Sequence, residues 1–354
     1  MNKIAVFILV FGLCACAAKL SAAEDWTYTP LPLLFYTSDT GIAGGGLLVV
    51  ERQANELDAG LQNLLLQTAV TYTQKSQLEV SALFQSDFGG GLYRMVGNFG
   101  FFNTPSLYYG VGPQAGFEEA YDQQKYYFET SLMRKLWRKL YAGGLFIYNY
   151  VDYTEIEPGG SLAAYLEAED SEEVSSEAGV ILQWDSRDSL TYPRRGSYVE
   201  LRATAASPTI GSESAFSKVK LDARTFRELL PDTILALQGV TSHGSGEMPL
   251  HRMEELGGLR VLRGYRFGRY RDKSTAVLQG ELRFPICKRF GGVAFAGGGL
   301  VGESYGEFRM NQTKVSGGVG LRFRPNLNSD VRIRLDIGLC EESTGVYITL
   351  LEAF

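Results

Sequence analysis

Six basic side chains lie within the fifteen residues of "LRVLRGYRFGRYRDK" (259–273), in a chain whose formal net charge is −6. The segment contains a single acid, and aromatic residues alternate with its cations. Arginine carries a planar guanidinium that donates paired hydrogen bonds to a carboxylate or a phosphate. The segment is therefore a candidate for recognising anions, either on this chain or on a ligand. Its cations are Arg260, Arg263, Arg266, Arg269, Arg271 and Lys273.

Three interpretations of this basic segment are open. Four arginines recur every three residues between positions 260 and 269, as on the basic face of a helix that binds nucleic acid. Gly264 and Gly268 weaken such a helix. A protein exported to the cell envelope would also be kept apart from nucleic acid, so we expect no nucleic-acid partner. A solvated loop that binds lipopolysaccharide phosphates is the second interpretation. The third, which we favour, is a loop folded into an enclosed space, where the chain's own acids hold it.

Other candidate chemistry is weaker. "SHGSGEM" (242–248) brings His243 close to Ser245, as in a lipase, but it has no nucleophile elbow or orienting acid, so we expect no enzyme. The acids of 155–177 predict a solvated external loop, with a divalent-cation site as the alternative. His251 is expected to be a polar loop residue. No cluster of cysteine and histidine indicates a metal, and we expect no cofactor.

The first 23 residues have the pattern of a signal peptide: a positive start, an apolar run and "SAA" before Glu24. Lipidation at Cys16, within "LCAC", is the alternative to ordinary cleavage. Export leaves Cys287 and Cys340, which we expect near opposite ends of the strands and too far apart for a disulfide, so that both stay free thiols.

The elements that must position the basic segment are strands. In "VRIRLDIGL" (331–339) aliphatic residues alternate with Arg332, Arg334, Asp336 and Gly338. Because neighbouring residues of a strand point to opposite faces, one face is aliphatic and the other carries charge. "YVELRATA" (198–205) and "KVKLDAR" (218–224) repeat the pattern. Long segments of this kind are typical of a membrane barrel, with apolar residues toward lipid and polar residues toward the lumen.

Counting candidate strands gives an all-β fold, a 16-stranded antiparallel transmembrane β-barrel with an inward-folded external loop. Connections alternate between short and long, as in bacterial barrels with even strand numbers. We expect residues 24–31 to be a short periplasmic segment and 32–354 the outer-membrane barrel domain, with the basic segment between strands 11 and 12. The expected strands are 32–38, 42–53, 61–73, 77–88, 91–102, 124–136, 141–154, 176–186, 197–207, 214–228, 232–243, 275–286, 293–303, 314–324, 331–341 and 345–354.

Five blocks of the sequence resemble the BamA/TamA superfamily of outer-membrane proteins, also called the bacterial surface antigen family. "LRGY" (262–265), preceded by "GG" (257–258), is similar to the hallmark of the family's inner loop. "WDSRDSLTYPRRGSYVELR", "GELRFPI", "GGVGLRFRP" and the aromatic end "ITLLEAF" follow the family's order. The hallmark-loop residues are Gly257, Gly258, Leu262, Gly264 and Tyr265.

The resemblance implies that Arg263 reaches acids on the inner wall, Glu281 first. The family's F-x-D-x-G strand has Gly297 in place of its aspartate here, so Asp336 is the expected substitute. Tyr265, Phe267 and Tyr270 are expected to pack the plug. Phe354 would mark the closing strand and its assembly signal. The short segment before the first strand leaves no room for the family's periplasmic POTRA domains.

As function, the resemblance implies protein assembly or translocation in outer-membrane biogenesis, with a plugged lumen and a lateral seam between the first and last strands. Expected partners are outer-membrane lipid and lipopolysaccharide, unfolded outer-membrane proteins and a separate periplasmic protein that delivers them. A passive pore or a structural barrel without assembly activity is the alternative. The expected location is the outer membrane of a Gram-negative-type bacterium.

Overall fold

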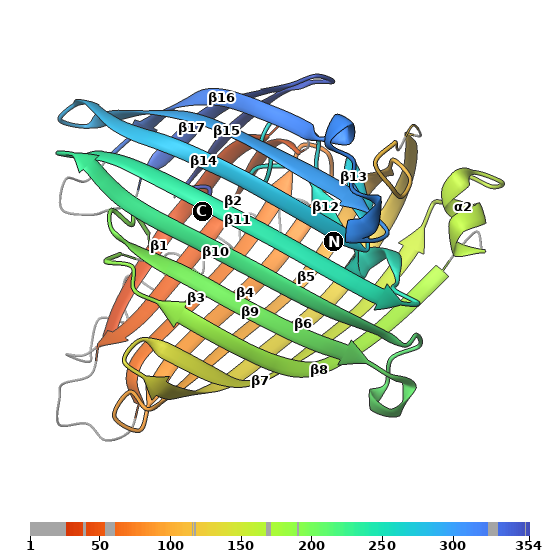
Figure 1. Cartoon of the computed structure of the whole chain (residues 1–354), viewed down its shortest axis with the longest axis horizontal. Coiled ribbons are helices and arrows are strands. Elements are labelled where there is room, and N and C mark those ends of the chain that lie inside the picture. Colours follow the sequence, from red (N-terminus) through yellow and green to blue (C-terminus); the bar gives the residue numbers. More distant parts are fainter. Residues whose placement is uncertain are drawn as a thin grey trace.

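A computed structural model shows a closed antiparallel barrel (Figure 1). The structure describes residues 26–37, 40–53, 61–114, 116, 118–167, 171–189, 191–324, 332–350 and 352–354. The expected signal peptide, 1–23, lies outside these residues, as do Cys16 and the first two residues of the expected periplasmic segment. Sixteen strands close the wall in sequence order, with β11 beside β14, because β12 and β13 form a separate two-stranded sheet. The expected fold class is thus confirmed.

The wall strands follow the expected positions closely. They are β1 (Trp26–Thr37), β2 (Gly41–Gln53), β3 (Leu61–Thr73), β4 (Leu78–Phe88), β5 (Tyr93–Tyr108), β6 (Glu119–Trp137), β7 (Leu140–Thr154), β8 (Ser171–Asp185), β9 (Gly196–Ala206), β10 (Phe216–Leu230), β11 (Thr233–Gly246), β14 (Ser274–Cys287), β15 (Phe290–Gly302), β16 (Lys314–Phe323), β17 (Ile333–Cys340) and β18 (Thr344–Leu350). The inner sheet is β12 (Glu254–Leu256) and β13 (Tyr270–Asp272), and the one α-helix of the described part is α2 (Ser161–Leu166).

Alternation of side chains decides which face of each strand is outside. Leu278 and Val319 are 68% and 61% exposed on the outer face. Glu281 and Arg322, each three residues further along the same strand, are buried inside. Asp336 on the neighbouring β17 is also buried inside. Because the period of a strand is two, this register puts the aliphatic residues outside and the ionic residues inside along a whole strand.

The first strand begins earlier than expected, at Trp26, and includes residues 26–31 of the expected periplasmic segment. Pro30 and Pro32 are unfavourable residues for a strand, because proline has no backbone N–H for a ladder. β1 pairs with β2 along its whole length, and in the described part of the chain its register with β18 covers Tyr36 and Thr37. Proline is tolerated where one edge of the strand needs no donor.

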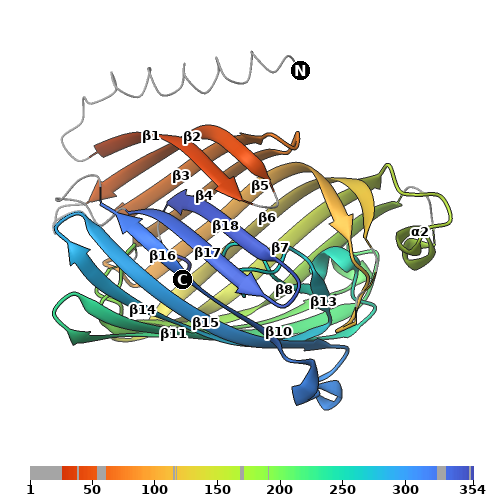
Figure 2. The same cartoon turned by 90° about the horizontal axis from the view of Figure 1, so that it is seen from above.

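The last strand ends earlier than expected, at Leu350. Residues 352–354 leave the sheet, and Ala353 and Phe354 are buried against Phe226 and Ala236. The prediction that Phe354 ends the closing strand is therefore wrong: its ring is buried in an apolar cluster with Phe226 of β10 and Ala236 of β11. Figure 2 shows β1 and β18, which are neighbours in the closed wall.

Three further features concern the inner loop, the cysteines and the helices. The segment from β11 to β14 enters the barrel, as the burial of Leu256, Leu262 and Tyr265 shows. Cys287 ends β14 and Cys340 ends β17, and both are free. Within the described residues, no helix has the length and apolar character needed to cross a membrane.

Candidate functional site

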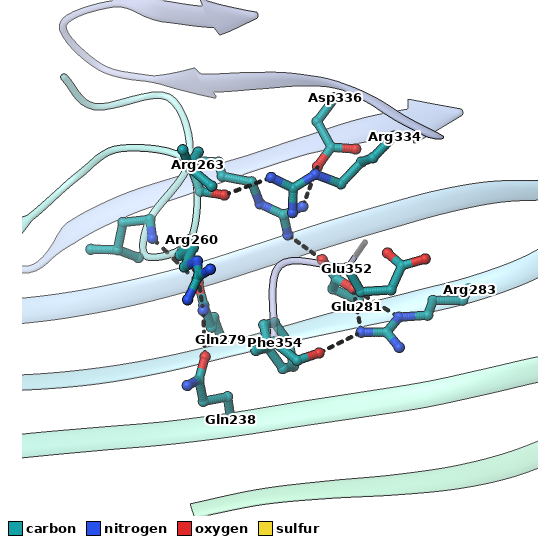
Figure 3. A network of polar contacts seen from close by, with 12 residues as sticks. Gln238, Arg260, Arg263, Gln279, Glu281, Arg283, Arg334, Asp336, Glu352 and Phe354 are labelled. Atoms are coloured by element: carbon teal, nitrogen blue, oxygen red, sulfur yellow. Dashed lines mark hydrogen bonds and ion pairs between the residues drawn. The ribbon is translucent and has the colours of Figure 1, made fainter. Parts of the chain in front are cut away.

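Arg263 is the central contact between the inner loop and the wall (Figure 3). Its Nη2 donates to Glu281 Oε1 at 2.5 Å, and its Nη1 donates to Asp336 Oδ2 at 2.5 Å. The two acids come from β14 and β17, so one guanidinium connects two strands. Arg263 is 2% exposed, and its Cζ lies 3.6 Å from the centre of the Phe295 ring. The structure thus brings together the three residues expected to form the loop-locking set.

Strand geometry explains why these acids converge. Glu281 and Asp336 both point inward, and β15 and β16 separate their strands. The Arg263 side chain therefore binds acids from two strands at once. A planar guanidinium with five donors can do this, and a point-like ammonium cannot.

The contact belongs to a larger network of buried arginines. Arg283 binds Glu281 at 2.9 Å, while Arg322 binds Asp336 at 2.5 Å and Glu352 at 2.8 Å. Glu281 thus shares its charge between the loop and Arg283 of its own strand, and Asp336 shares its charge between the loop and Arg322 of the neighbouring β16. Buried charges are stable only when they are paired in this way, because each costs several kcal/mol to desolvate.

The loop backbone also touches the wall directly. Gly264 has φ +123°, and a Cβ there would lie 3.0 Å from the Leu339 carbonyl carbon. On β17, a Cβ at Gly338 would come within 2.6 Å of the Arg263 backbone. The Tyr347 hydroxyl accepts from the Gly264 N–H at 3.0 Å, and Ser343 donates to the Gly264 carbonyl at 2.7 Å. Only a pair of glycines allows two backbones to approach this closely.

The glycine at the position of the family's aspartate has its own role. A Cβ at Gly297 would meet Leu262 Cδ2 at 3.1 Å, and one at Gly299 would meet Leu262 Cδ1 at 2.8 Å. Leu262 is buried and has a positive φ of 48°. Because Gly297 has no side chain, β15 has a notch there, a space that Leu262 of the loop fills. Arg263 binds Asp336 in place of the missing aspartate.

The rest of the hallmark loop is packed, with one exception. Gly257 and Gly258 have positive φ values, and the Gly258 N–H donates to the Tyr265 carbonyl at 2.9 Å. Tyr265 and Tyr270 meet edge to face, with ring centres 5.7 Å apart. Phe267 is 62% exposed, so its expected place in the plug is wrong. It precedes Gly268, whose positive φ of 68° allows a turn of the chain.

Most loop cations bind the chain's own acids. Arg266 pairs with Glu118 at 2.9 Å, Arg269 with Glu342 at 2.6 Å, Arg271 with Glu255 at 2.9 Å and Lys273 with Glu303 at 3.2 Å. No helix forms between 257 and 273, so the basic-face interpretation is wrong. The favoured interpretation, a loop held by its own chain's carboxylates, agrees with these contacts.

A second anchor was not expected from the sequence. Arg252 binds Glu177 at 2.5 Å, and Glu254 binds Lys218 at 2.6 Å and Lys220 at 2.8 Å. Although burial opposes it, the two lysines hold the pKa of Glu254 well below its usual range. Glu177 is fully buried, so the expectation of a solvated acidic segment is wrong at this residue. The alternation on β8, with Glu173, Ser175 and Glu177 on one face, was the available signal.

His251 is part of the second anchor. Its Nδ1 lies 2.9 Å from Glu173 Oε2 and its Nε2 lies 2.9 Å from Ser175 Oγ. Burial lowers the pKa of His251 to about 4, against the opposing effect of Glu173. The imidazole is therefore neutral near pH 7, and His251 is a polar residue of the connection from β11, buried and hydrogen-bonded to the wall.

The candidate hydrolytic pair does not form. His243 Nδ1 lies 2.8 Å from Ser274 Oγ, whereas Ser245 Oγ lies 2.9 Å from Ser217 Oγ. Among the described residues, no group of three histidine, cysteine, aspartate or glutamate side chains has the arrangement of a metal site.

The end of the chain contributes to the same network. Arg283 Nη2 donates to the Phe354 carbonyl oxygen at 3.1 Å, and Arg322 holds Glu352. Residues 352–354 thus lie within the barrel, beside the acids that bind Arg263 (Figure 3). Among the described residues, the seam of β18 with β1 has two register pairs, Tyr36 with Ile348 and Thr37 with Tyr347.

Comparison with known proteins places this geometry. BamA from Haemophilus ducreyi lacking POTRA domains 1–3 matches with a TM-score of 0.65 and 12% identity, over 93% of this chain and 70% of that one. CdiB from Escherichia coli matches with a TM-score of 0.60 and 14% identity, over 93% and 64%. CdiB from Acinetobacter baumannii matches with a TM-score of 0.57 and 13% identity, over 94% and 60%.

These likenesses concern the fold, and the chain spans 60–70% of the length of the matched chains. No curated protein matches the sequence. The family model of the Omp85 superfamily domain matches residues 63–340, which include the inner loop and both of its wall acids. The chain therefore belongs to the Omp85 superfamily of outer-membrane β-barrel proteins.

Proposed function

We propose that this protein assembles or translocates other outer-membrane proteins by opening the seam between β1 and β18. The carrying observation is the length of that seam. Among the described residues, β1 and β18 share two register pairs, whereas β17 and β18 share seven, the next smallest number between neighbours in the wall. A backbone hydrogen bond contributes about 1 kcal/mol net. Opening this seam is therefore the least costly way to break the wall.

The edge of β1 supports the proposal. Among the described residues, the register of β1 with β2 covers all of Trp26–Thr37, whereas its register with β18 covers Tyr36 and Thr37. An unpaired edge is a template to which an incoming strand adds by backbone hydrogen bonds. In lipid, an unsatisfied backbone group costs several kcal/mol, so a substrate strand that pairs there gains free energy. The substrates would be unfolded outer-membrane proteins.

The inner loop supports it from the other side of the wall. Arg263 connects β14 to β17, and Gly264 binds Tyr347 of β18. These contacts would keep β14–β18 together as one body when β18 separates from β1. Delivery by a separate periplasmic protein, contact with lipopolysaccharide and export by a signal peptide remain parts of the proposal.

A disulfide across the seam tests the proposal. Tyr36 and Ile348 are register partners on the outer face, and directly opposite Cα atoms of antiparallel strands lie about 4.5–5.5 Å apart, within disulfide range. We would place Tyr36→Cys and Ile348→Cys in a chain whose native cysteines are serines and follow the folding of a urea-denatured eight-stranded barrel into vesicles. The reduced protein should speed folding, and the oxidised protein should not.

The matched control is Val319→Cys with Ile337→Cys, an outward-facing register pair in the fully paired β16–β17 ladder. Its oxidation should leave the acceleration intact. Full acceleration by the oxidised seam variant would contradict the proposal. A steady, large, ungated single-channel current from the reduced protein, without any acceleration of folding, would instead support the alternative of a passive pore.

A further inference from the structure

A cavity of about 270 Å³ lies at the end of the barrel where the β14–β15 turn meets the segment between β8 and β9. Among the described residues that line it, six are cationic and one, Asp232, is acidic. Asp232 already binds Arg194 at 2.6 Å, so it does not neutralise the others. This end carries the chain's residues 352–354 and is opposite to the mouth occupied by the inner loop, so it is the periplasmic end of the proposed topology.

Two arginines at the cavity have donors that the described residues leave unused. Arg322 is 2% exposed, and its Nη2 has no hydrogen-bond partner there, although Nε and Nη1 bind Glu352 and Asp336. Arg332 likewise has an unused Nε, and its Cζ lies 3.2 Å from the centre of the Tyr192 ring. An unmade hydrogen bond of a buried charged group costs more than a neutral one, so these donors favour an anionic ligand.

The chemistry of the lining distinguishes among anions. A carboxylate offers two oxygens, whereas a phosphate offers at least three that accept from several guanidinium groups at once. Lys288, exposed in the turn beside the cavity, adds a flexible cation. Phe284 and Phe290 also line the cavity and are partly exposed, so an apolar path leads from the charges to the outer face of the barrel.

We propose that this cavity binds a phosphate-bearing anion at the periplasmic mouth of the barrel. The ligand is either the headgroup of an anionic phospholipid of the inner leaflet or a soluble phosphate. The inference does not depend on the seam, because none of the lining residues belongs to β1 or β18. It adds a ligand site to a part of the barrel that lies outside the hallmark loop.

Cys287 provides a reporter, because it lines the cavity and is an exposed free thiol. We would replace Cys14, Cys16 and Cys340 with serine in the full chain and measure the rate at which neutral N-ethylmaleimide modifies Cys287. One arm adds inorganic phosphate, with chloride at equal ionic strength as the reference. The other compares nanodiscs of phosphatidylglycerol with nanodiscs of phosphatidylcholine. We expect at least threefold slower modification in one arm.

Slowing by phosphate identifies a soluble ligand, and slowing by phosphatidylglycerol alone identifies a headgroup. Lys288→Gln with Arg332→Gln should abolish the protection, and Lys288→Gln alone, at an exposed position, should halve it if the double variant does not fold. Arg138→Gln with Lys139→Gln, which removes two exposed cations from the β6–β7 turn, should preserve it. The proposal is overturned if neither arm slows modification, or if the protection survives the loss of Lys288 and Arg332.

Discussion

Replacing Arg263 with alanine should release the inner loop while leaving the barrel folded. The substitution removes two buried ion pairs of 2.5 Å and the contact with Phe295. Breaking a buried pair by removing one partner costs about 3–5 kcal/mol, largely because the other charge stays buried. Here Glu281 keeps Arg283, and Asp336 keeps Arg322. We therefore expect the lower end of that range, about 3 kcal/mol.

A loss of about 3 kcal/mol reduces the docking equilibrium constant by about two orders of magnitude. The loop is the part that should respond, because the wall ladders on either side do not involve Arg263. Trypsin can report this, since Arg266 and Arg269 lie within the loop and trypsin cleaves after arginine, and cleavage of a briefly opened segment follows the population of the open form. Cleavage between 257 and 273 should become about a hundredfold faster.

Two variants sharpen the measurement. Arg263→Lys keeps a charge but cannot fork onto acids of two strands, so its cleavage rate should lie nearer to alanine than to the native residue. Arg309→Ala, an exposed arginine of the external β15–β16 connection, is the matched control and should leave loop cleavage unchanged. Cleavage of Arg263→Ala within threefold of the native rate, with the same heat-modifiable mobility, would refute the proposed locking role.

Two further predictions concern the notch and the second anchor. Gly297→Asp, which restores the family's aspartate, should destabilise loop docking by about 1–3 kcal/mol because its Cβ would meet Gln279 at 2.7 Å and Leu262 at 3.1 Å. Trypsin should then cleave the loop faster, and adding Leu262→Ala should reverse part of that increase. Cleavage of Gly297→Asp at the native rate would contradict the packing of Leu262 against Gly297. Burial lowers the pKa of His251 to about 4 in the docked loop, so docking should weaken as the pH falls from 6.5 toward 4, because the undocked imidazole binds the proton first. The loss of docking free energy should approach at most about 3 kcal/mol. His251→Gln should flatten the dependence of loop cleavage on pH over this interval, measured with an acid-active protease, and an unchanged slope would contradict the assignment.

The alternation of residues carried most of the fold prediction. A one-residue slip would move every aliphatic side chain of 331–339 to the wrong face, so the pattern leaves one choice of inside and outside. The resulting strand positions and the place of the inner loop agree with the structure within a few residues. The two ends of the wall were predicted less well, because Pro30 and Pro32 are local signals against a strand, and their place in β1 depends on its pairing with β2 along the whole strand.

The site divides in the same way. Arg263 and Glu281 were accessible from the sequence through their place in the hallmark blocks, and Asp336 through its inward face. The contacts of Leu262 with Gly297, of Gly338 with the Arg263 backbone and of Arg252 with Glu177 were not, because each joins residues 35 or more positions apart and neither strand alternation nor the hallmark blocks mark the pair.

What the sequence by itself determined is the periodicity: which residues form strands, how many cross the wall and which side of each carries charge. That information is local, since it depends on neighbours along one strand. The tertiary structure alone decided which carboxylate meets which arginine, where β18 ends and how short the seam with β1 is. Those outcomes depend on distances across a closed lumen, where burial and pairing of charges compete over the whole circumference and no short stretch of residues records the result.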